Sequence, residues 1–322
     1  MVESLQASPG RSNLSNAQKP KRPLYSHSRL SSFENCPQLF KYRYLDKIKT
    51  ESEGVEAFMG KRVHEVLERL YHHVGRYGRP PSLNQVQDRF RKDWPLHWHE
   101  NIVIVREGLD AEHYIQLGVR CLENYYRSYY PFDQGETIGI EKNVLAKLDA
   151  DGSYRIRGII DRVVRTAPGC YEVHDYKTGG YVPPRKKLDL DRQLALYQIG
   201  IQQTYDDVEE VRLVWHYVAF GKTLTSSRTP EALECLKSDT ISLIDHVETT
   251  SEFKATPSKL CNWCEFRDLC PDAKLDRPSA APAGPEPPLP LDPGTASPAS
   301  PTGTAATTNG AEPGDPAQLS LL

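Results

Sequence analysis

Long apolar runs are missing from this chain of 322 residues, and this absence argues against a membrane protein. No run approaches the roughly 18 apolar residues that a membrane-spanning helix needs, and no signal-peptide core is visible near the N-terminus. We therefore expect a soluble, cytoplasmic protein without a membrane partner. The 7 cysteines are an odd number for a chain of this size, which argues against a disulfide framework and favours reduced thiols or metal ligands.

The chain also lacks a basic excess, since its formal net charge is −3. Any nucleic acid must therefore be held by a local groove rather than by the bulk charge of the protein. Aromatic residues are absent after Phe266, and 11 of the 25 prolines lie between Pro278 and Pro316. Such a segment cannot bury enough apolar surface to offset its ordering entropy, so residues 274–322 are predicted to be a disordered tail.

Residues 24–273 are predicted to form one domain, preceded by a disordered polar arm at 1–23. Apolar spacing predicts short helices broken near Cys36-Pro37, longer helices at 57–74, 109–130, 190–201 and 230–250, and strands at 138–148, 154–165, 170–176 and 211–220. Pro168-Gly169 is predicted to turn the chain between the second and third of these strands. This order of elements indicates an α/β fold in which helices flank a mixed sheet.

The stretch YEVHDYKTGG at 171–180 ends a predicted strand on an acid, an aromatic residue, a lysine and two glycines. Residues two apart in a strand point to the same face, so Asp175 and Lys177 are expected to project side by side. Taken alone, they would be an exposed ion pair of little energetic consequence.

Asp161, on the preceding predicted strand YRIRGIIDRVV, changes this interpretation. If the hairpin turns near residue 168, Asp161 and Asp175 lie opposite each other with Cβ atoms about 4.5–5.5 Å apart. Carboxylates that close raise each other's cost of ionisation, and a divalent cation such as Mg²⁺ compensates them. Lys177 would then orient or deprotonate a water, or stabilise charge on a phosphate. The alternative is a solvated, inert acid pair at the end of a sheet.

Two short motifs carry a family resemblance. One strand holds Gly158 and Asp161 as Gly-x-x-Asp, and the next holds Asp175 and Lys177 as Asp-x-Lys. This arrangement resembles the core of the PD-(D/E)XK nucleases, and more narrowly that of the RecB-type exonucleases. Over about residues 24–273, the resemblance implies a restriction-endonuclease-like α/β fold, a mixed β-sheet flanked by helices with a C-terminal cysteine segment. It also implies DNA cleavage with Mg²⁺ or Mn²⁺.

Two further patterns of that branch occur in the chain. Gly60 and His64 supply a Gly-x-x-x-His pattern before the sheet, whereas a lone helical histidine is usually a packed or exposed residue. Gln193 and Tyr197 supply a Gln-x-x-x-Tyr pattern after the lysine, one turn apart on one helix face. The resemblance implies that Gln193 lies near the catalytic strand and Tyr197 near the DNA. The alternative is an amphipathic helix with a half-buried tyrosine.

The resemblance thus implies a complete catalytic site. Its implied metal ligands are His64, Asp161, Asp175 and the carbonyl of Tyr176. Lys177 would assist the attacking water, and Gln193 and Tyr197 would line the site.

The cysteines divide into one plus three. Cys261, Cys264 and Cys270 are spaced C-x2-C-x5-C near the end of the predicted domain, and Cys36 lies far upstream. Thiolates at such short spacing commonly hold zinc or an iron–sulfur cluster, and the spacing leaves both open. Their position around a nuclease core resembles the iron–sulfur staple of AddB and of CRISPR-associated RecB-type nucleases, which implies a [4Fe–4S] cluster. Such a centre would tie the N-terminal helix to the C-terminal segment.

Three short runs indicate partners. The basic runs KYRY (41–44) and PRKK (184–187) are predicted either to track a phosphate backbone or to be solvated. The last five residues, QLSLL (Gln318–Leu322), resemble the bacterial sliding-clamp-binding pentapeptide, with Leu322 in place of the usual phenylalanine. The clamp would then be a partner that tethers the protein to DNA.

Together these features predict a metal-dependent DNA exonuclease that acts at single-stranded ends in repair or recombination, with a helicase as a further partner. The residues leave two alternatives open. One is a non-catalytic iron–sulfur subunit that binds DNA or acts as a scaffold, and the other is a CRISPR spacer-processing nuclease.

Overall fold

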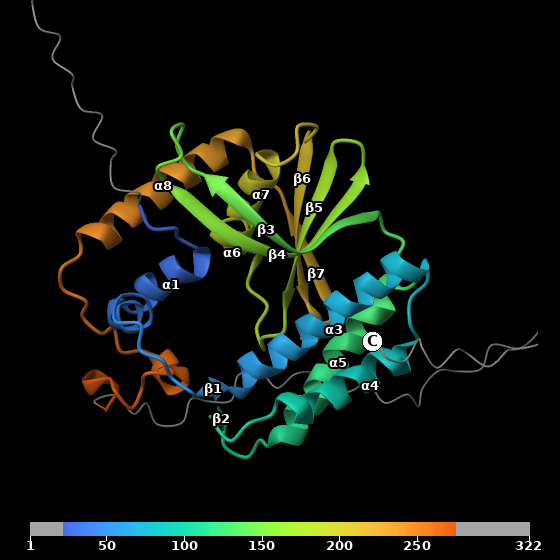
Figure 1. The fold of residues 1–322 in the computed structure, drawn as a ribbon, viewed down its shortest axis with the longest axis horizontal. Helices are drawn as coiled ribbons and strands as arrows, with labels where there is room; N and C mark the ends of the chain where they lie inside the picture. The colour runs from blue at the N-terminus through green and yellow to red at the C-terminus, as the bar shows by residue number, and fades with distance from the viewer. Residues whose placement is uncertain (1–21, 275–322) are drawn as a thin grey trace, which may run out of the picture.

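Helices pack on both faces of one five-stranded sheet in the computed structural model, which describes residues 22–274 (Figure 1). Residues 1–21 and 275–322 are outside the described part, and with them most of the predicted arm, the tail and the peptide Gln318–Leu322. Within residues 22–274, no helix combines the length and the apolar character needed to cross a membrane.

Arg22, which the sequence placed in the N-terminal arm, lies at the start of the described chain. Its guanidinium pairs with Asp245 at 2.8 Å and with Glu248 at 2.6 Å. It also lies over the ring of Tyr154, with Cζ 4.1 Å from the ring centroid. These contacts attach the start of the described chain to a helix near its other end.

The sheet has the strand order β3-β4-β5-β6-β7. Its strands are β3 (Glu136–Lys147), β4 (Arg155–Ala167), β5 (Cys170–Lys177), β6 (Glu210–Tyr217) and β7 (Lys222–Ser226). Strands β5 and β6 run parallel, and the other neighbours are antiparallel. A parallel pair needs a crossover connection, which α7 (Arg192–Gln202) supplies. The four strands predicted from the sequence are confirmed, and β7 is additional.

The helices fall into two groups around the sheet. In chain order they are α1 (His27–Asn35), α2 (Pro37–Phe40), a π-helix (Lys41–Leu45), α3 (Val55–Tyr77), α4 (Leu83–His97), α5 (Ala111–Tyr129), α6 (Arg185–Leu188), α7 and α8 (Pro230–Thr249). Short 3₁₀ turns occupy Val218–Phe220, Lys259–Trp263 and Pro271–Lys274, and β1 (Glu53–Gly54) pairs with β2 (Ile102–Val103). Helix α4 was not predicted, although Ser82 and Gln85 form a capping box at its start.

Two buried apolar clusters lie on opposite faces of the sheet. Helices α3 and α5 cover one face, with α4 packed against both of them, and α1, α7 and α8 lie on the other side (Figure 1). Because successive strand residues point to opposite faces, β5 contributes Val173 to one cluster and Tyr176 to the other. The strand end that carries Asp175 and Lys177 is therefore positioned by packing on both sides.

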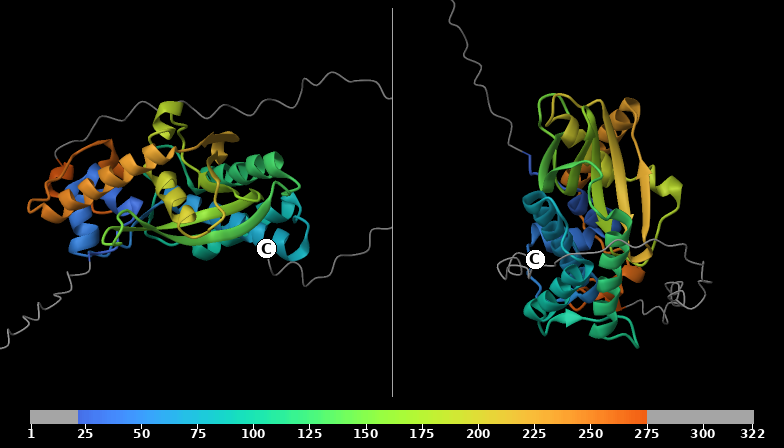
Figure 2. Two further views of the ribbon diagram at one scale, coloured as in Figure 1. Left: turned by 90° about the horizontal axis from the view of Figure 1, so that it is seen from above. Right: turned by 90° about the vertical axis from the view of Figure 1, so that its right-hand side faces the viewer.

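Residues 27–45 and 251–274 lie side by side although they are far apart in the chain (Figures 1 and 2). Arg43 Nε donates to Glu265 Oε1 at 2.9 Å, and the rings of Tyr42 and Phe266 are 5.4 Å apart. Lys41 pairs with Asp46 at 2.5 Å. The KYRY run therefore makes internal contacts, which differs from the prediction of a solvated run or one that follows a phosphate backbone.

Candidate active site

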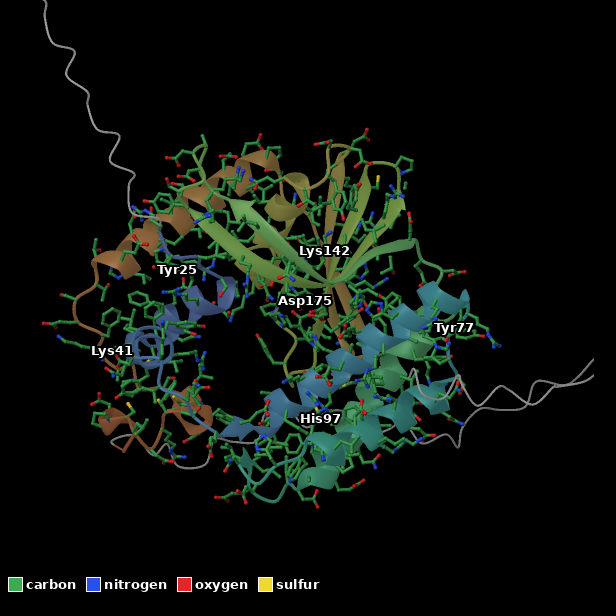
Figure 3. All side chains as sticks on the ribbon, in the orientation of Figure 1. Tyr25, Lys41, Tyr77, His97, Lys142 and Asp175 are labelled. Carbon is green, nitrogen blue, oxygen red and sulfur yellow. The ribbon has the colours of Figure 1, made fainter. Side chains whose placement is uncertain are left out.

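Asp161 and Asp175 lie just beyond the last residue pair of the β4–β5 ladder. The observed ladder pairs Arg162 with His174, and one further step in this register sets Asp161 opposite Asp175. There the backbone N–H of Tyr176 donates to Oδ2 of Asp161 at 2.7 Å. Figure 3 shows Asp175 near the centre of the molecule, between the sheet and α3. The opposition that was predicted from a turn near residue 168 follows from the observed register.

Glu141, which was not predicted, brings a third carboxylate to the same level of the sheet. The β3–β4 register sets it opposite Asp161, on the side away from β5. One ligand atom each of Glu141, Asp161 and His64 lie within 4.8 Å of one another. The φ of Glu141 is 46°, a left-handed conformation that is costly for a residue with a side chain and clusters at functional sites. The turn after β3 was the available signal, because it pairs residue 141 with residue 161.

His64 reaches these acids from helix α3. Its Nε2 donates to the carbonyl of Tyr176 at 2.9 Å, and its Nδ1 lies 3.4 Å from Oδ1 of Asp161. Burial disfavours the charged imidazolium, but the hydrogen bond and charge of Asp161 outweigh burial and raise the pKa of His64 to about 8. Gly60 permits the close approach of α3, since a Cβ there would lie 2.8 Å from Oγ1 of Thr178.

Gln193 holds Asp175 and Lys177 in one arrangement. Nζ of Lys177 lies 2.8 Å from Oδ2 of Asp175 and donates to Oε1 of Gln193 at 3.0 Å. Nε2 of Gln193 donates to Oδ1 of Asp175 at 3.1 Å. These partners fix the amide orientation, because only its oxygen accepts from an ammonium and only its nitrogen donates to a carboxylate. Asp175 is 5% exposed, so the pair is part of a buried network rather than a solvated surface ion pair.

Tyr197 is buried against the glycine of the Gly-x-x-Asp motif. A Cβ at Gly158 would lie 2.1 Å from Cε1 of Tyr197, so any larger residue would displace the ring. The hydroxyl of Tyr197 accepts from Nε2 of Gln193 at 3.2 Å. Gly158 and Tyr197 therefore act together to position Gln193. The ring is in the core, and its nearness to DNA stays a prediction.

The electrostatics of the site favour a bound cation. Burial raises the pKa of Asp175, Asp161 raises it further, and Lys177 opposes the shift. Burial and Asp161 likewise raise the pKa of Glu141. Oδ2 of Asp175 is buried and, apart from the ion pair with Lys177, has no hydrogen-bond partner. Among the described residues, the group whose ligand atoms lie within 4.8 Å of one another comprises His64, Glu141 and Asp161, and it does not include Asp175. Two carboxylates and an imidazole are ligands for Mg²⁺ or Mn²⁺, so these three residues fit a divalent ion, and ligation by Asp175 stays a prediction.

The four predicted cysteine ligands surround one cavity. This cavity has a volume of about 220 Å³ and is lined by Cys36, Cys261, Cys264 and Cys270. Two of the sulfur atoms accept hydrogen bonds from backbone N–H groups, Cys36 from Thr256 at 3.4 Å and Cys261 from Ser258 at 3.3 Å. The fold therefore brings together the one-plus-three set that is separated in sequence.

Comparison with known proteins gives a family and distant relatives. The model of the PD-(D/E)XK nuclease superfamily matches residues 25–271. The Gene 69 protein of Mycobacterium phage L5 is 26% identical over 292 residues, covering 77% of this chain and 96% of that protein. The Gene 69 protein of Mycobacterium phage D29 is 23% identical over 281 residues, covering 78% and 97%. A solved candidate exonuclease from Eubacterium rectale has 13% identity and a TM-score of 0.42, covering 86% of this chain and 97% of its own.

The family match spans nearly the whole described fold and includes Glu141, the Gly-x-x-Asp and Asp-x-Lys motifs, and the cysteine segment. The predicted α/β architecture, a restriction-endonuclease-like mixed sheet flanked by helices, is confirmed. The chain belongs to the PD-(D/E)XK nuclease superfamily.

Proposed function

We propose that this protein is a metal-dependent deoxyribonuclease of the RecB type that hydrolyses phosphodiester bonds at single-stranded DNA ends in repair or recombination. The observation that carries the proposal is the row of carboxylates across three adjacent strands, Glu141, Asp161 and Asp175, with His64 beside it and Lys177 beyond it. A row of like charges directly opposite one another is destabilising by itself. A scaffold protein has no use for it, whereas a metal-dependent hydrolase requires it.

The metal ligands would be His64, Glu141, Asp161 and Asp175, with the carbonyl of Tyr176 nearby. When bound, the ion would supply a nucleophilic water at neutral pH and offset negative charge on the phosphate. His64 now shares its two ring nitrogens between Asp161 and the Tyr176 carbonyl. One of these contacts must be released for ligation, because only a ring nitrogen without its proton binds a metal.

Lys177 is the cation placed to meet the phosphate. It donates to Gln193 and pairs with Asp175, and both contacts use its ammonium form. In that form it donates hydrogen bonds to the attacking water and stabilises charge on the phosphate oxygens, and it does not remove a proton. Of the three roles that the sequence left open for Lys177, the contacts favour orienting the water and stabilising charge on the phosphate over deprotonating the water.

For the cysteines we propose a [4Fe–4S] cluster. The four cysteines line one cavity, and backbone N–H groups donate to two of the sulfur atoms, as either a zinc site or a cluster would allow. The one-plus-three spacing, which resembles the iron–sulfur staple of RecB-type nucleases, favours the cluster over zinc. When bound, the cluster would join the two ends of the domain.

A cleavage assay tests the proposed activity. We expect the purified protein to shorten an end-labelled single-stranded oligonucleotide stepwise in Mn²⁺ or Mg²⁺, and to leave it intact in chelator. A time course with both end labels gives the polarity of digestion and separates stepwise shortening from internal cuts. Binding of the oligonucleotide in Mn²⁺ without any cleavage would contradict the proposal and favour a scaffold subunit. The clamp and helicase partners stay predictions.

A further inference from the structure

The second basic run lies in the loop that leaves the catalytic strand. This segment, residues 178–191, is called the basic loop below and connects β5 to α7. Its two ends are held in place, the first by Thr178 against Gly60 and the last by Asp191, which accepts from the N–H of Leu194 at 3.0 Å. Leu188 is buried, and its carbonyl accepts from Nη2 of Arg228 at 2.5 Å. The loop is therefore anchored, which lowers the entropy cost of binding a ligand.

The middle of the basic loop is exposed. Tyr181 is 62% exposed, and α6, which carries Arg185, Lys186 and Lys187, projects from the body of the molecule in both views of Figure 2. Arg185 lies 3.7 Å from Asp189. Within residues 22–274, Lys186 and Lys187 make no ion pair. The loop thus presents one large aromatic ring and two uncompensated positive charges to solvent.

The two acidic residues of the basic loop, Asp189 and Asp191, hydrogen-bond to groups within the protein. Asp189 accepts from Oγ of Ser226 at 2.9 Å, and Asp191 caps α7. Free positive charge is therefore left on the outer side of the loop, in a protein whose overall charge is −3. This is the local basic surface that nucleic acid binding would require here.

Two glycines, Gly179 and Gly180, leave open space two and three residues after Lys177. Gly179 and Gly180 have no positive φ, so the backbone conformation does not require glycine. A Cβ at either position would meet no described atom within 4 Å, so packing does not require glycine either. Glycines without a conformational or packing cause are expected where another backbone approaches closely. The phosphate backbone of a substrate next to Lys177 would be such a backbone.

We propose that the basic loop binds single-stranded DNA beside the active site, with a base stacked on Tyr181 and phosphates held by Lys186 and Lys187. The location of cleavage next to this loop rests on the proposed function. A single strand is the partner that fits, because an exposed tyrosine needs the open face of a base, which a duplex hides. The KYRY run cannot serve in the same way, since its side chains are engaged in internal contacts.

Anisotropy of a labelled oligo(dT), measured in chelator so that no cleavage occurs, tests this proposal. Loss of one stacked base in Tyr181→Ala is expected to weaken binding by at least about fivefold. The same variant is expected to bind a blunt duplex as the wild type does. The double variant Lys186→Ser/Lys187→Ser is expected to make the slope of log K against log salt shallower by about 1.4, since two phosphate contacts are lost.

Matched variants at other exposed tyrosines and lysines test whether the loss of binding is specific to the basic loop. Tyr130, at the end of α5, is 60% exposed, and Tyr130→Ala is expected to bind oligo(dT) as the wild type does. Lys92→Ser/Lys254→Ser removes two exposed lysines from other elements and is expected to leave the salt slope unchanged. Thermal unfolding of every variant confirms that each is folded.

Two results would overturn the proposal: wild-type affinity of Tyr181→Ala for oligo(dT), or an equal loss of affinity for the duplex. Failure of the nuclease proposal gives a different pattern. In that case oligo(dT) binding depends on Tyr181, but the wild type cleaves nothing in Mn²⁺. If the wild type cleaves DNA in Mn²⁺ but Tyr181→Ala binds oligo(dT) with unchanged affinity, the nuclease proposal is supported and the role of the basic loop is refuted.

Discussion

Replacing Asp175 by Ala is expected to lower the rate of DNA cleavage by about a thousandfold or more, because it removes a proposed metal ligand and the partner of Lys177. The same change is expected to leave the protein folded. Asp175 is buried opposite Asp161, so its removal also relieves a repulsion between like charges. Initial rates on end-labelled DNA in Mn²⁺, with thermal unfolding of the same samples, measure both effects.

Asp93 provides the matched control, since it is another buried carboxylate, 2% exposed, but is far in sequence from the acid row formed by Glu141, Asp161 and Asp175. Its Oδ2 is paired with Arg69 at 2.5 Å and with Arg89 at 2.9 Å. Asp93→Ala is expected to lower the free energy of unfolding by about 2 kcal/mol and to keep the cleavage rate per folded molecule. Asp175→Asn preserves side-chain shape and repeats the test if Asp175→Ala unfolds. Wild-type cleavage by a folded Asp175 variant would refute the assignment of the site.

Replacing Cys36 by Ser is expected to remove the proposed cluster and to lower the free energy of unfolding by about 4 kcal/mol, the scale of closing a very long loop. Cys36 is the single predicted ligand from the N-terminal segment, and the other three cysteines that line the cavity lie more than two hundred residues later. Arg43 and Glu265 still pair across the same boundary, so the two segments are weakened rather than separated. Iron and sulfide content, visible absorbance and chemical unfolding of anaerobically purified protein measure the outcome.

Cys235 is the control for this experiment. It is exposed on α8, and its Sγ donates only a weak hydrogen bond to Asp239 at 3.7 Å. Cys235→Ser is expected to keep wild-type iron content and stability. Wild-type iron in Cys36→Ser would contradict the ligand assignment, and stoichiometric zinc in the wild-type protein would favour the zinc alternative.

Much of the site was predictable because strand geometry is regular. Alternation along β5 places Asp175 and Lys177 on one face. The turn at Pro168-Gly169, together with a register shift between Arg165 and Ala167 that the sequence did not reveal, determines which residue of β4 lies opposite. The same reasoning applied to the β3–β4 hairpin finds Glu141. Glu141 was not predicted because the Gly-x-x-Asp and Asp-x-Lys motifs include only residues of the β4–β5 hairpin.

Tertiary contacts were the part that the sequence could not provide. The ring of Tyr197 fits against Gly158, and Thr178 fits against Gly60, yet each pair joins elements whose relative position no local pattern encodes. The KYRY run shows the same limit. Its basic and aromatic composition is typical of a surface that binds nucleic acid, but Tyr42 and Arg43 contact the C-terminal segment instead. The uncompensated positive charge of the basic loop likewise depends on tertiary contacts, because Asp189 and Asp191 accept hydrogen bonds from other parts of the protein.

Binding of Mn²⁺ to the wild type and to Asp161→Asn tests the central claim most directly, because Asp161 lies between Glu141 and Asp175 in the acid row. In chelator, Asp161→Asn should have a stability close to that of the wild type, since it removes the repulsion from Glu141 and Asp175 but also weakens the pairing with His64. At a Mn²⁺ concentration of 100 times the Kd, the wild type should gain about 2.7 kcal/mol, and Asp161→Asn should gain little. Equal stabilisation of both proteins by Mn²⁺ would contradict the account.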